Sequence, residues 1–158
     1  IATVIGFPLG ACHTHAKVEE VKQALKDGAN EFDMVINIGK LKEGKLDEVT
    51  QEIKDIKAAI PEGMLLKVII ETSLLSKQDK INACQCVSDA QADYIKTSTG
   101  FSIGGATVED VALLREHVSK DVKVKASGGV KTYDDLVKMV EAGAERIGTS
   151  SGVELMQG

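Results

Sequence analysis

Three lysines recur at equal intervals inside apolar runs of this sequence. The spacing from Lys67 to Lys96 and from Lys96 to Lys125 is 29 residues, and each lysine interrupts a short stretch rich in apolar or β-branched residues. Asp33 interrupts a fourth stretch of this kind, F-D-M-V-I-N. Desolvating an ammonium group is unfavourable, so a lysine in a buried strand needs a counter-charge or a water-filled cavity, or becomes a neutral, nucleophilic amine.

These four side chains suit chemistry at a carbonyl group. Neighbouring ammonium groups and burial both depress the pKa of a lysine, and a free amine attacks a carbonyl to form a Schiff base. The iminium then draws electrons from an adjacent carbon–carbon bond, which breaks or forms more easily. Asp33 or a second lysine would carry the proton. A single buried Lys–Asp pair is more often a structural salt bridge, but three lysines with one aspartate favour a functional site.

Glycine-bearing turns accompany the lysines late in the chain. They are Gly100-Phe-Ser, Gly128-Gly129 and Gly148-Thr-Ser-Ser, and Lys131 follows the second of them. Glycines let backbone N–H groups approach an oxyanion, and helix N-termini add a favourable dipole. Three such turns after consecutive strands indicate a phosphate site, although each turn by itself could simply reverse the chain.

The elements that position these residues follow from the hydrophobic pattern. We expect strands at residues 2–7, 31–37, 64–71, 94–99, 122–127 and 145–149. Between them, helical periodicity predicts helices at about 13–27, 46–60, 76–91, 107–118 and 132–142, and a last helix from residue 150. Ser76 with Asp79 and Thr107 with Asp110 have the spacing of capping boxes, and Thr132 is expected to cap the fifth helix.

Six alternating βα units predict an α/β protein with a parallel sheet. A closed (β/α)₈ barrel and an open doubly-wound sheet both fit this order. We favour a TIM-barrel type, because the glycine-rich turns follow the last strands and not the first. Strand alternation would then aim the lysines and Asp33 at the same level into the barrel interior. A full barrel has eight units, so two are missing from this chain.

Composition narrows the class of partner. The chain has 158 residues, the length of one domain, and a formal net charge of −5 without a basic run. Aromatic residues make up 3% and tryptophan is absent, so we expect no nucleic-acid partner. No stretch is long and apolar enough for a membrane span. Three cysteines without framework spacing indicate reduced thiols and a cytoplasmic location.

Other reactive residues carry weaker signals. His13-x-His15 has metal-ligand types but no third ligand, so we expect no metal. Cys12 lies near the loop end of a strand, but nothing adjacent would lower the pKa of its thiol. Glu71 ends the third strand and could support the residues that contact the substrate.

Six motifs together resemble the deoxyribose-phosphate aldolase family. They are V-I-G-F-P-L-G, D-M-V-I-N, L-K-V-I-I-E-T, Y-I-K-T-S-T-G-F, V-K-A-S-G-G-V and R-I-G-T-S-S-G, which span the chain in the family's order and spacing. The resemblance implies a metal- and cofactor-free class I aldolase on a (β/α)₈ barrel. Such an enzyme reversibly cleaves 2-deoxy-D-ribose 5-phosphate to D-glyceraldehyde 3-phosphate and acetaldehyde.

The resemblance also implies a role for each site residue. Lys96 matches the Schiff-base lysine, Lys125 the lysine that assists proton transfer, and Asp33 the acidic proton carrier. Lys67 occupies a further active-site position. The family's phosphate cradle implies Gly100, Gly128, Gly129, Gly148, Ser150 and Ser151. Lys131 stands where several relatives have arginine, which would weaken bidentate phosphate recognition.

The chain starts at what resembles the family's third strand, so the first two βα units have no counterpart. We expect that this segment was removed, or that two chains complete each other's open sheet edges. The family implies a homodimer that acts on small phosphosugar and aldehyde substrates. Two alternatives stay open: a Schiff-base lyase for another phosphosugar, and a non-catalytic phosphosugar-binding fragment.

Overall fold

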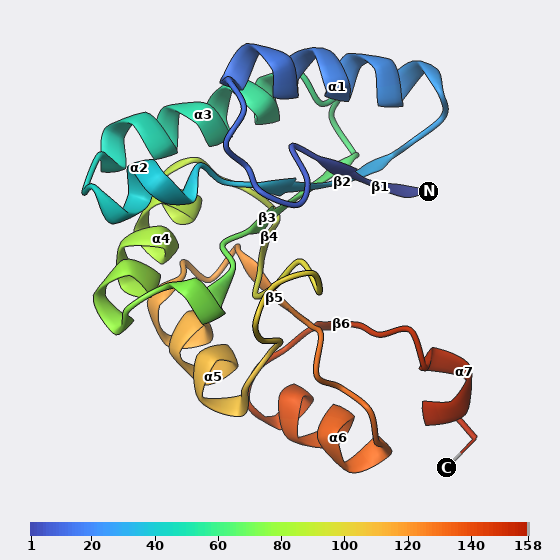
Figure 1. Cartoon of the computed structure of the whole chain (residues 1–158). Coiled ribbons are helices and arrows are strands. Elements are labelled where there is room, and N and C mark those ends of the chain that lie inside the picture. The colour runs from blue at the N-terminus through green and yellow to red at the C-terminus, as the bar shows by residue number, and fades with distance from the viewer. Residues whose placement is uncertain (158) are drawn as a thin grey trace.

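The computed structural model describes residues 1–157 as a curved parallel sheet with helices along its outer side (Figure 1). Within this range six strands follow one another in space in chain order. They are β1 (Ala2–Ile5), β2 (Glu31–Val35), β3 (Leu65–Ile69), β4 (Tyr94–Lys96), β5 (Lys123–Ser127) and β6 (Arg146–Gly148). The predicted α/β architecture of six parallel βα units is confirmed.

Helices connect the strands and cover one face of the sheet (Figure 1). The longer ones are α1 (Thr14–Lys26), α3 (Leu46–Ala58), α4 (Lys77–Asp89), α5 (Val108–His117) and α6 (Tyr133–Glu141). Two short elements were not predicted, α2 (Ile38–Lys42) and the 3₁₀ turn η1 (Thr72–Leu74). The last helix, α7 (Gly152–Leu155), begins later than expected, and Gly158 of that expected helix lies outside the described residues.

The strands are shorter than the apolar runs that predict them. The pattern extends β2 to Asn37, but the Asn37 side chain instead accepts the N–H of Lys40 at 3.1 Å and caps α2. After β3, Glu71 adopts a left-handed conformation that turns the chain into η1. Polar residues at strand ends therefore start the next element earlier than hydrophobicity alone indicates.

Side-chain caps fix where several helices begin. Ser76 and Asp79 form a capping box on α4, as their spacing predicts, and Thr132 caps α6 as expected, in a capping box with Asp135. At α5 the Thr107 hydroxyl accepts the Asp110 N–H, but the predicted capping box is incomplete, because the Asp110 side chain does not return to Thr107. The Asp110 carboxylate instead forms an ion pair with Lys80 at 2.6 Å and so links α5 to α4.

The two faces of the sheet have opposite chemistry. Outward-facing residues such as Phe32, Met34, Leu66 and Val68 are fully buried against the helices and form the apolar core. Because successive side chains on a strand alternate between faces, Asp33 and Lys67 project to the inner face. The apolar core therefore lies outside the sheet, and charge gathers on the concave side.

The sheet is a half-barrel and does not close on itself. In the described part of the chain, β1 and β6 are the edge strands, and each pairs with one neighbour. None of the helices in residues 1–157 is both long and apolar enough to span a bilayer.

Candidate active site

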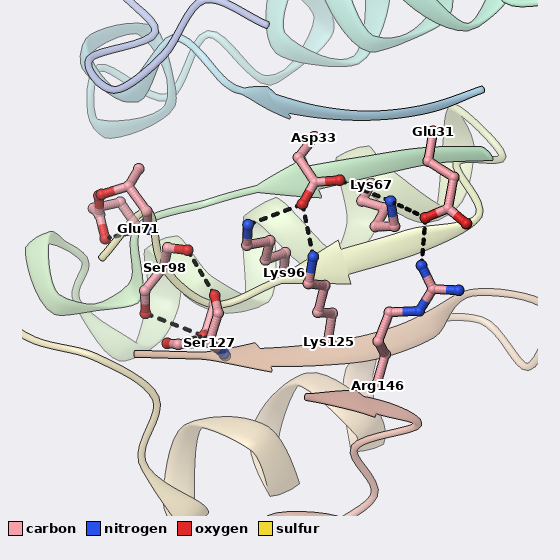
Figure 2. A network of polar contacts seen from close by, with 11 residues as sticks. Glu31, Asp33, Lys67, Glu71, Lys96, Ser98, Lys125, Ser127 and Arg146 are labelled. Atoms are coloured by element: carbon pink, nitrogen blue, oxygen red, sulfur yellow. Dashed lines mark hydrogen bonds and ion pairs between the residues drawn. The ribbon is translucent and has the colours of Figure 1, made fainter. Parts of the chain in front are cut away.

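Asp33 lies at the centre of a charged cluster on the inner face (Figure 2). Its Oδ2 accepts hydrogen bonds from Lys96 Nζ at 2.9 Å and from Lys125 Nζ at 2.8 Å. Its Oδ1 accepts one from Lys67 Nζ at 2.8 Å. The structure thus brings all four charged candidates together, although they come from the four strands β2 to β5. One carboxylate serves three ammonium groups, so the cluster holds an excess of positive charge.

The lysines do not share one level as their equal spacing predicts. Lys96 and Lys125 are direct partners across β4 and β5. Lys67, however, pairs with Tyr94, and the partner of Lys96 on β3 is Ile69, two residues further along. The prediction of matched levels is therefore wrong for Lys67, because neighbouring strands of a barrel-like sheet are staggered. Lys67 is the direct partner of Asp33 across β2 and β3, so it is the side chains of Lys96 and Lys125 that span the step and reach Asp33.

Burial and ion pairing set the charge states in this cluster. Burial raises the pKa of Asp33, but the hydrogen bonds from the three lysines outweigh it and lower that pKa to about 2. Burial lowers the pKa of Lys125, and together with the neighbouring ammonium groups it outweighs the opposing attraction of Asp33. At neutral pH the cluster therefore holds an ionised carboxylate beside a lysine that releases its proton more readily than usual.

The cluster continues away from the loop end of the strands through residues that sequence reasoning did not single out (Figure 2). Lys67 Nζ also contacts Glu31 at 2.6 Å, and Glu31 forms a second ion pair with Arg146 on β6. The hydrogen bond from Lys67 lowers the pKa of Glu31, and Arg146 adds to this effect. Glu31 stands two residues before Asp33, so strand alternation was the signal that places it on the same face.

A cavity of about 580 Å³ opens beside Lys96 at the carboxyl ends of β4, β5 and β6. Every residue of the expected phosphate cradle lines it: Gly100, Gly128, Gly129, Gly148, Ser150 and Ser151. Lys131 reaches the same cavity and is exposed. Of the four charged candidates, Lys96 alone is among the described residues that line it. The structure therefore joins the glycine turns and the lysine cluster at one side chain.

Close backbone contacts explain why two of these turns need glycine. A Cβ on Gly105 would lie 2.5 Å from the carbonyl carbon of Gly128, which no real side chain tolerates. Gly128 itself has a φ of +72°, in the left-handed region that glycine adopts most easily. The turn after β4 is thereby packed directly onto the turn after β5.

The remaining candidates either lie away from this cavity or contact a residue that lines it. His13 and His15 are exposed at the start of α1, and residues 1–157 contain no group of three side chains that could hold a metal ion. Cys12 is exposed in the loop before that helix. Glu71 is buried and contacts Thr99, which lines the cavity.

A parallel α/β half-barrel with an inward lysine cluster beside a glycine-lined cavity defines the class of lysine-dependent barrel enzymes. Comparison with known proteins refines this class. The family described as DeoC/LacD family aldolase matches residues 1–158. The chain belongs to this aldolase family, as its motifs indicate.

Individual relatives agree with the family match. The deoxyribose-phosphate aldolase of Thermococcus gammatolerans is 55% identical over 159 residues, which cover 100% of this chain and 71% of that protein. The enzyme of the same name from Caldicellulosiruptor saccharolyticus is 57% identical over 159 residues, 99% of this chain and 72% of its own length. The chain thus spans about seven tenths of these relatives.

A solved structure shows the same arrangement in space. The tetrameric deoxyribose phosphate aldolase from Aeropyrum pernix superposes with a TM-score of 0.89 at 35% sequence identity. The match covers 99% of this chain and 66% of the other. The half-barrel described above corresponds to part of that fold.

Proposed function

We propose that this protein is a class I aldolase that cleaves 2-deoxy-D-ribose 5-phosphate to D-glyceraldehyde 3-phosphate and acetaldehyde. One observation carries the proposal: Lys96 is both bonded to Asp33 and exposed to the cavity that the glycine turns line. The amine can therefore meet an aldehyde at one end of a sugar while the phosphate at the other end lies among backbone N–H groups.

Lys96 is the proposed nucleophile. Its Nζ is 2.9 Å from Asp33 Oδ2, the same oxygen that Lys125 contacts at 2.8 Å. A proton that leaves the Lys96 ammonium can pass through this shared oxygen or through Lys125, whose pKa is lowered by burial. The neutral amine then adds to carbon 1 of the open-chain sugar, and loss of water gives the iminium.

The bond between carbons 2 and 3 breaks next. The hydroxyl on carbon 3 loses its proton and becomes the aldehyde of glyceraldehyde 3-phosphate, while the bonding electrons move toward the iminium to form an enamine. Protonation of carbon 2 and hydrolysis of the new iminium release acetaldehyde and restore Lys96. We assign both proton transfers to the group formed by Asp33 and Lys125, a positioned acid–base pair.

Lys67 and the cradle residues have supporting roles in this proposal. Lys67 is fully buried between Asp33 and Glu31, so we assign it to orient Asp33 and to maintain the positive potential of the cluster. The turns after β4, β5 and β6 would hold the phosphate, with Lys131 adding charge at the rim of the cavity.

Trapping of the Schiff base tests the proposal directly. Incubation with acetaldehyde and borohydride, followed by peptide mass mapping, is expected to place a stable adduct on Lys96. The variant Lys96→Leu should lose both the adduct and cleavage of 2-deoxy-D-ribose 5-phosphate, whereas Lys54→Leu, on the exposed face of α3, should retain both. An unmodified Lys96 in the wild-type chain would refute the mechanism.

The activity is favoured over the two alternatives considered from sequence. Identity of 55% across the whole chain to a deoxyribose-phosphate aldolase favours this substrate over another phosphosugar and favours a catalytic protein over a mere binding fragment. An adduct on Lys96 without cleavage of deoxyribose 5-phosphate would instead indicate a lyase for a different sugar.

We further propose that the chain assembles with copies of itself, as a dimer at the smallest, in the cytoplasm. The relative from Aeropyrum pernix is described as a tetramer, and edge strands such as β1 and β6 offer unpaired backbone groups. The free thiols of Cys12, Cys84 and Cys86 suit a reducing compartment. Light scattering tests the assembly, and a monomer at micromolar concentration would contradict it.

A further inference from the structure

Glu71 occupies an unfavourable position just beyond the end of β3. Its backbone has φ 56° and ψ 67°, a left-handed conformation that disfavours residues with a Cβ. Its side chain is 2% exposed, so a carboxylate is buried there as well. Strained backbone and buried charge are both destabilising, and strain of this kind tends to gather where function requires a fixed geometry.

The Glu71 carboxylate binds a single residue through both oxygens. Oε2 accepts the Thr99 hydroxyl at 2.5 Å, and Oε1 accepts the Thr99 N–H at 3.2 Å. These donors are neutral groups, unlike the lysines that surround Asp33. The contact also joins two loops that are 28 residues apart in sequence, since Thr99 follows the strand that carries Lys96. Figure 2 shows Glu71 beyond the lysine cluster, on the side of Ser98 and Ser127.

Thr99 connects the Glu71 carboxylate to the turn that lines the cavity. Its hydroxyl oxygen, while donating to Glu71, accepts the N–H of Phe101 at 3.0 Å. The N–H groups on both sides of Gly100 are therefore occupied, and within residues 1–157 the Gly100 N–H has no protein acceptor. Thr99 and Gly100 both line the cavity. The bonds that start at Glu71 thus leave one donor of this turn free for an anion.

We infer that Glu71 is a positioning residue for the phosphate group, which acts through Thr99 to hold the turn at Gly100 against the anion-binding cavity. The inference rests on the proposed function for the identity of the sugar, but not for the anion. It assigns Glu71 to recognition of the phosphorylated end of the substrate and leaves formation of the Schiff base to the lysine cluster.

Three variants separate this role from a purely structural one. Glu71→Gly removes the carboxylate and also relieves the left-handed strain, so the protein is expected to fold. Glu71→Gln keeps the shape and can still accept one of the two Thr99 donors. Gln91→Gly is the matched control, because Gln91 also has a φ of 56° but lies after α4, away from the cavity.

The first readout is binding of inorganic phosphate, measured by titration and by the rise in Tm. We expect Glu71→Gly to weaken binding about 10- to 100-fold, Glu71→Gln to weaken it less, and Gln91→Gly to leave it unchanged. Equal phosphate affinity in Glu71→Gly and Gln91→Gly would overturn the inference. This readout needs no catalysis, so it decides the inference even if wild-type protein traps no aldehyde.

The second readout compares two sugars. For Glu71→Gly we expect kcat/KM for 2-deoxy-D-ribose 5-phosphate to fall about 10- to 100-fold, mainly through KM, and kcat/KM for 2-deoxy-D-ribose to stay within about twofold. Trapping of acetaldehyde on Lys96 should be unchanged. An equal loss with both sugars would overturn the inference, because it would mean that Glu71 supports the lysine cluster and not the phosphate site.

Discussion

Lys17 and Glu52 form a buried ion pair on the helix-covered side of the sheet, whereas Asp33 binds three lysines on the inner side. In the outer pair one ammonium meets one carboxylate at 2.8 Å, and the Thr14 hydroxyl and the Asn37 N–H donate to the same carboxylate. In the inner cluster a single carboxylate is shared by three ammonium groups. The outer network is balanced in charge, and the inner one is not.

This difference separates a structural use of buried charge from a chemical one. Lys17 is fully buried, and its Nζ also donates to the Val35 carbonyl at 2.8 Å, so it links α1 to β2 and α3. Lys96 instead lines the cavity, and the cationic groups of its cluster (three lysines and Arg146) outnumber the carboxylates of Asp33 and Glu31. A balanced pair holds elements together, whereas the unbalanced cluster contains a lysine, Lys125, whose pKa is lowered.

Among changes that compare the inner cluster with the outer pair, neutralising the inner anion should have the largest effect. Asp33→Asn removes the shared proton acceptor of Lys96 and Lys125, so kcat for 2-deoxy-D-ribose 5-phosphate should fall about 10²- to 10⁴-fold. Aldehyde trapping on Lys96 should persist, because amine addition does not require Asp33. Steady-state kinetics and borohydride trapping measure the two steps. A variant with wild-type kcat would show that the inner cluster is as structural as the outer pair.

Breaking the outer pair should affect stability and leave the chemistry intact. Lys17→Met leaves Glu52 as a buried carboxylate without a counter-charge, so the free energy of unfolding should fall by about 3–5 kcal/mol. Denaturant titration measures this loss, and kcat per folded molecule should stay within about twofold. Lys22→Met on the same helix is the control, because the pair of Lys22 with Glu19 is exposed to solvent and contributes little to stability. A similar loss in both variants would remove the distinction.

The inner cluster should also give the protein a defined response to acid. The pKa of Asp33 is about 2 in the folded protein, below its ordinary value of 3.8, so its contribution is present above pH 4 and is lost as the pH falls toward 2. That contribution is about 2 kcal/mol. The stability advantage of wild type over Asp33→Asn should therefore shrink by this amount between pH 5 and pH 2. Lys125 acts in the same direction at high pH: because its pKa in the folded protein is below the ordinary 10.5, stability rises as the pH approaches that value. An advantage that is independent of pH would contradict the assignment.

Sequence reasoning could find the members of the inner cluster but not its connections. Polar residues inside apolar runs identify Asp33 and the lysines, because burial makes such residues exceptional. Neighbouring strands of a barrel-like sheet are staggered, and the stagger between β3 and β4 means that equal spacing misplaced Lys67 by two residues. The contact of Glu31 with Arg146 joins β2 to β6, strands that meet only because the sheet curves.

The pair of Lys17 with Glu52 could not be predicted from the sequence, for a different reason. Lys17 and Glu52 lie on helices among many charged residues, where a lysine or glutamate is normally solvated. The glycine at position 6 is one indirect sign that the Lys17 side chain packs there, because a Cβ on residue 6 would lie 2.7 Å from Lys17 Cε. Only the packing of α1 and α3 against the end of β2 distinguishes this lysine from its exposed neighbours.

Neutralising both members of the outer pair should change stability less than the substitutions of Asp33 or of Lys17 alone. In Lys17→Met with Glu52→Gln, the amide oxygen can still accept from Thr14 or from the Asn37 N–H, and no buried charge is left alone. The double variant should therefore lose only about 1–2 kcal/mol, less than Lys17→Met by itself. A thermodynamic cycle over the two single variants and the double measures this coupling. Additive losses would mean that Lys17 contributes through packing alone, and the contrast between a balanced pair and an unbalanced cluster would then rest on the inner face only.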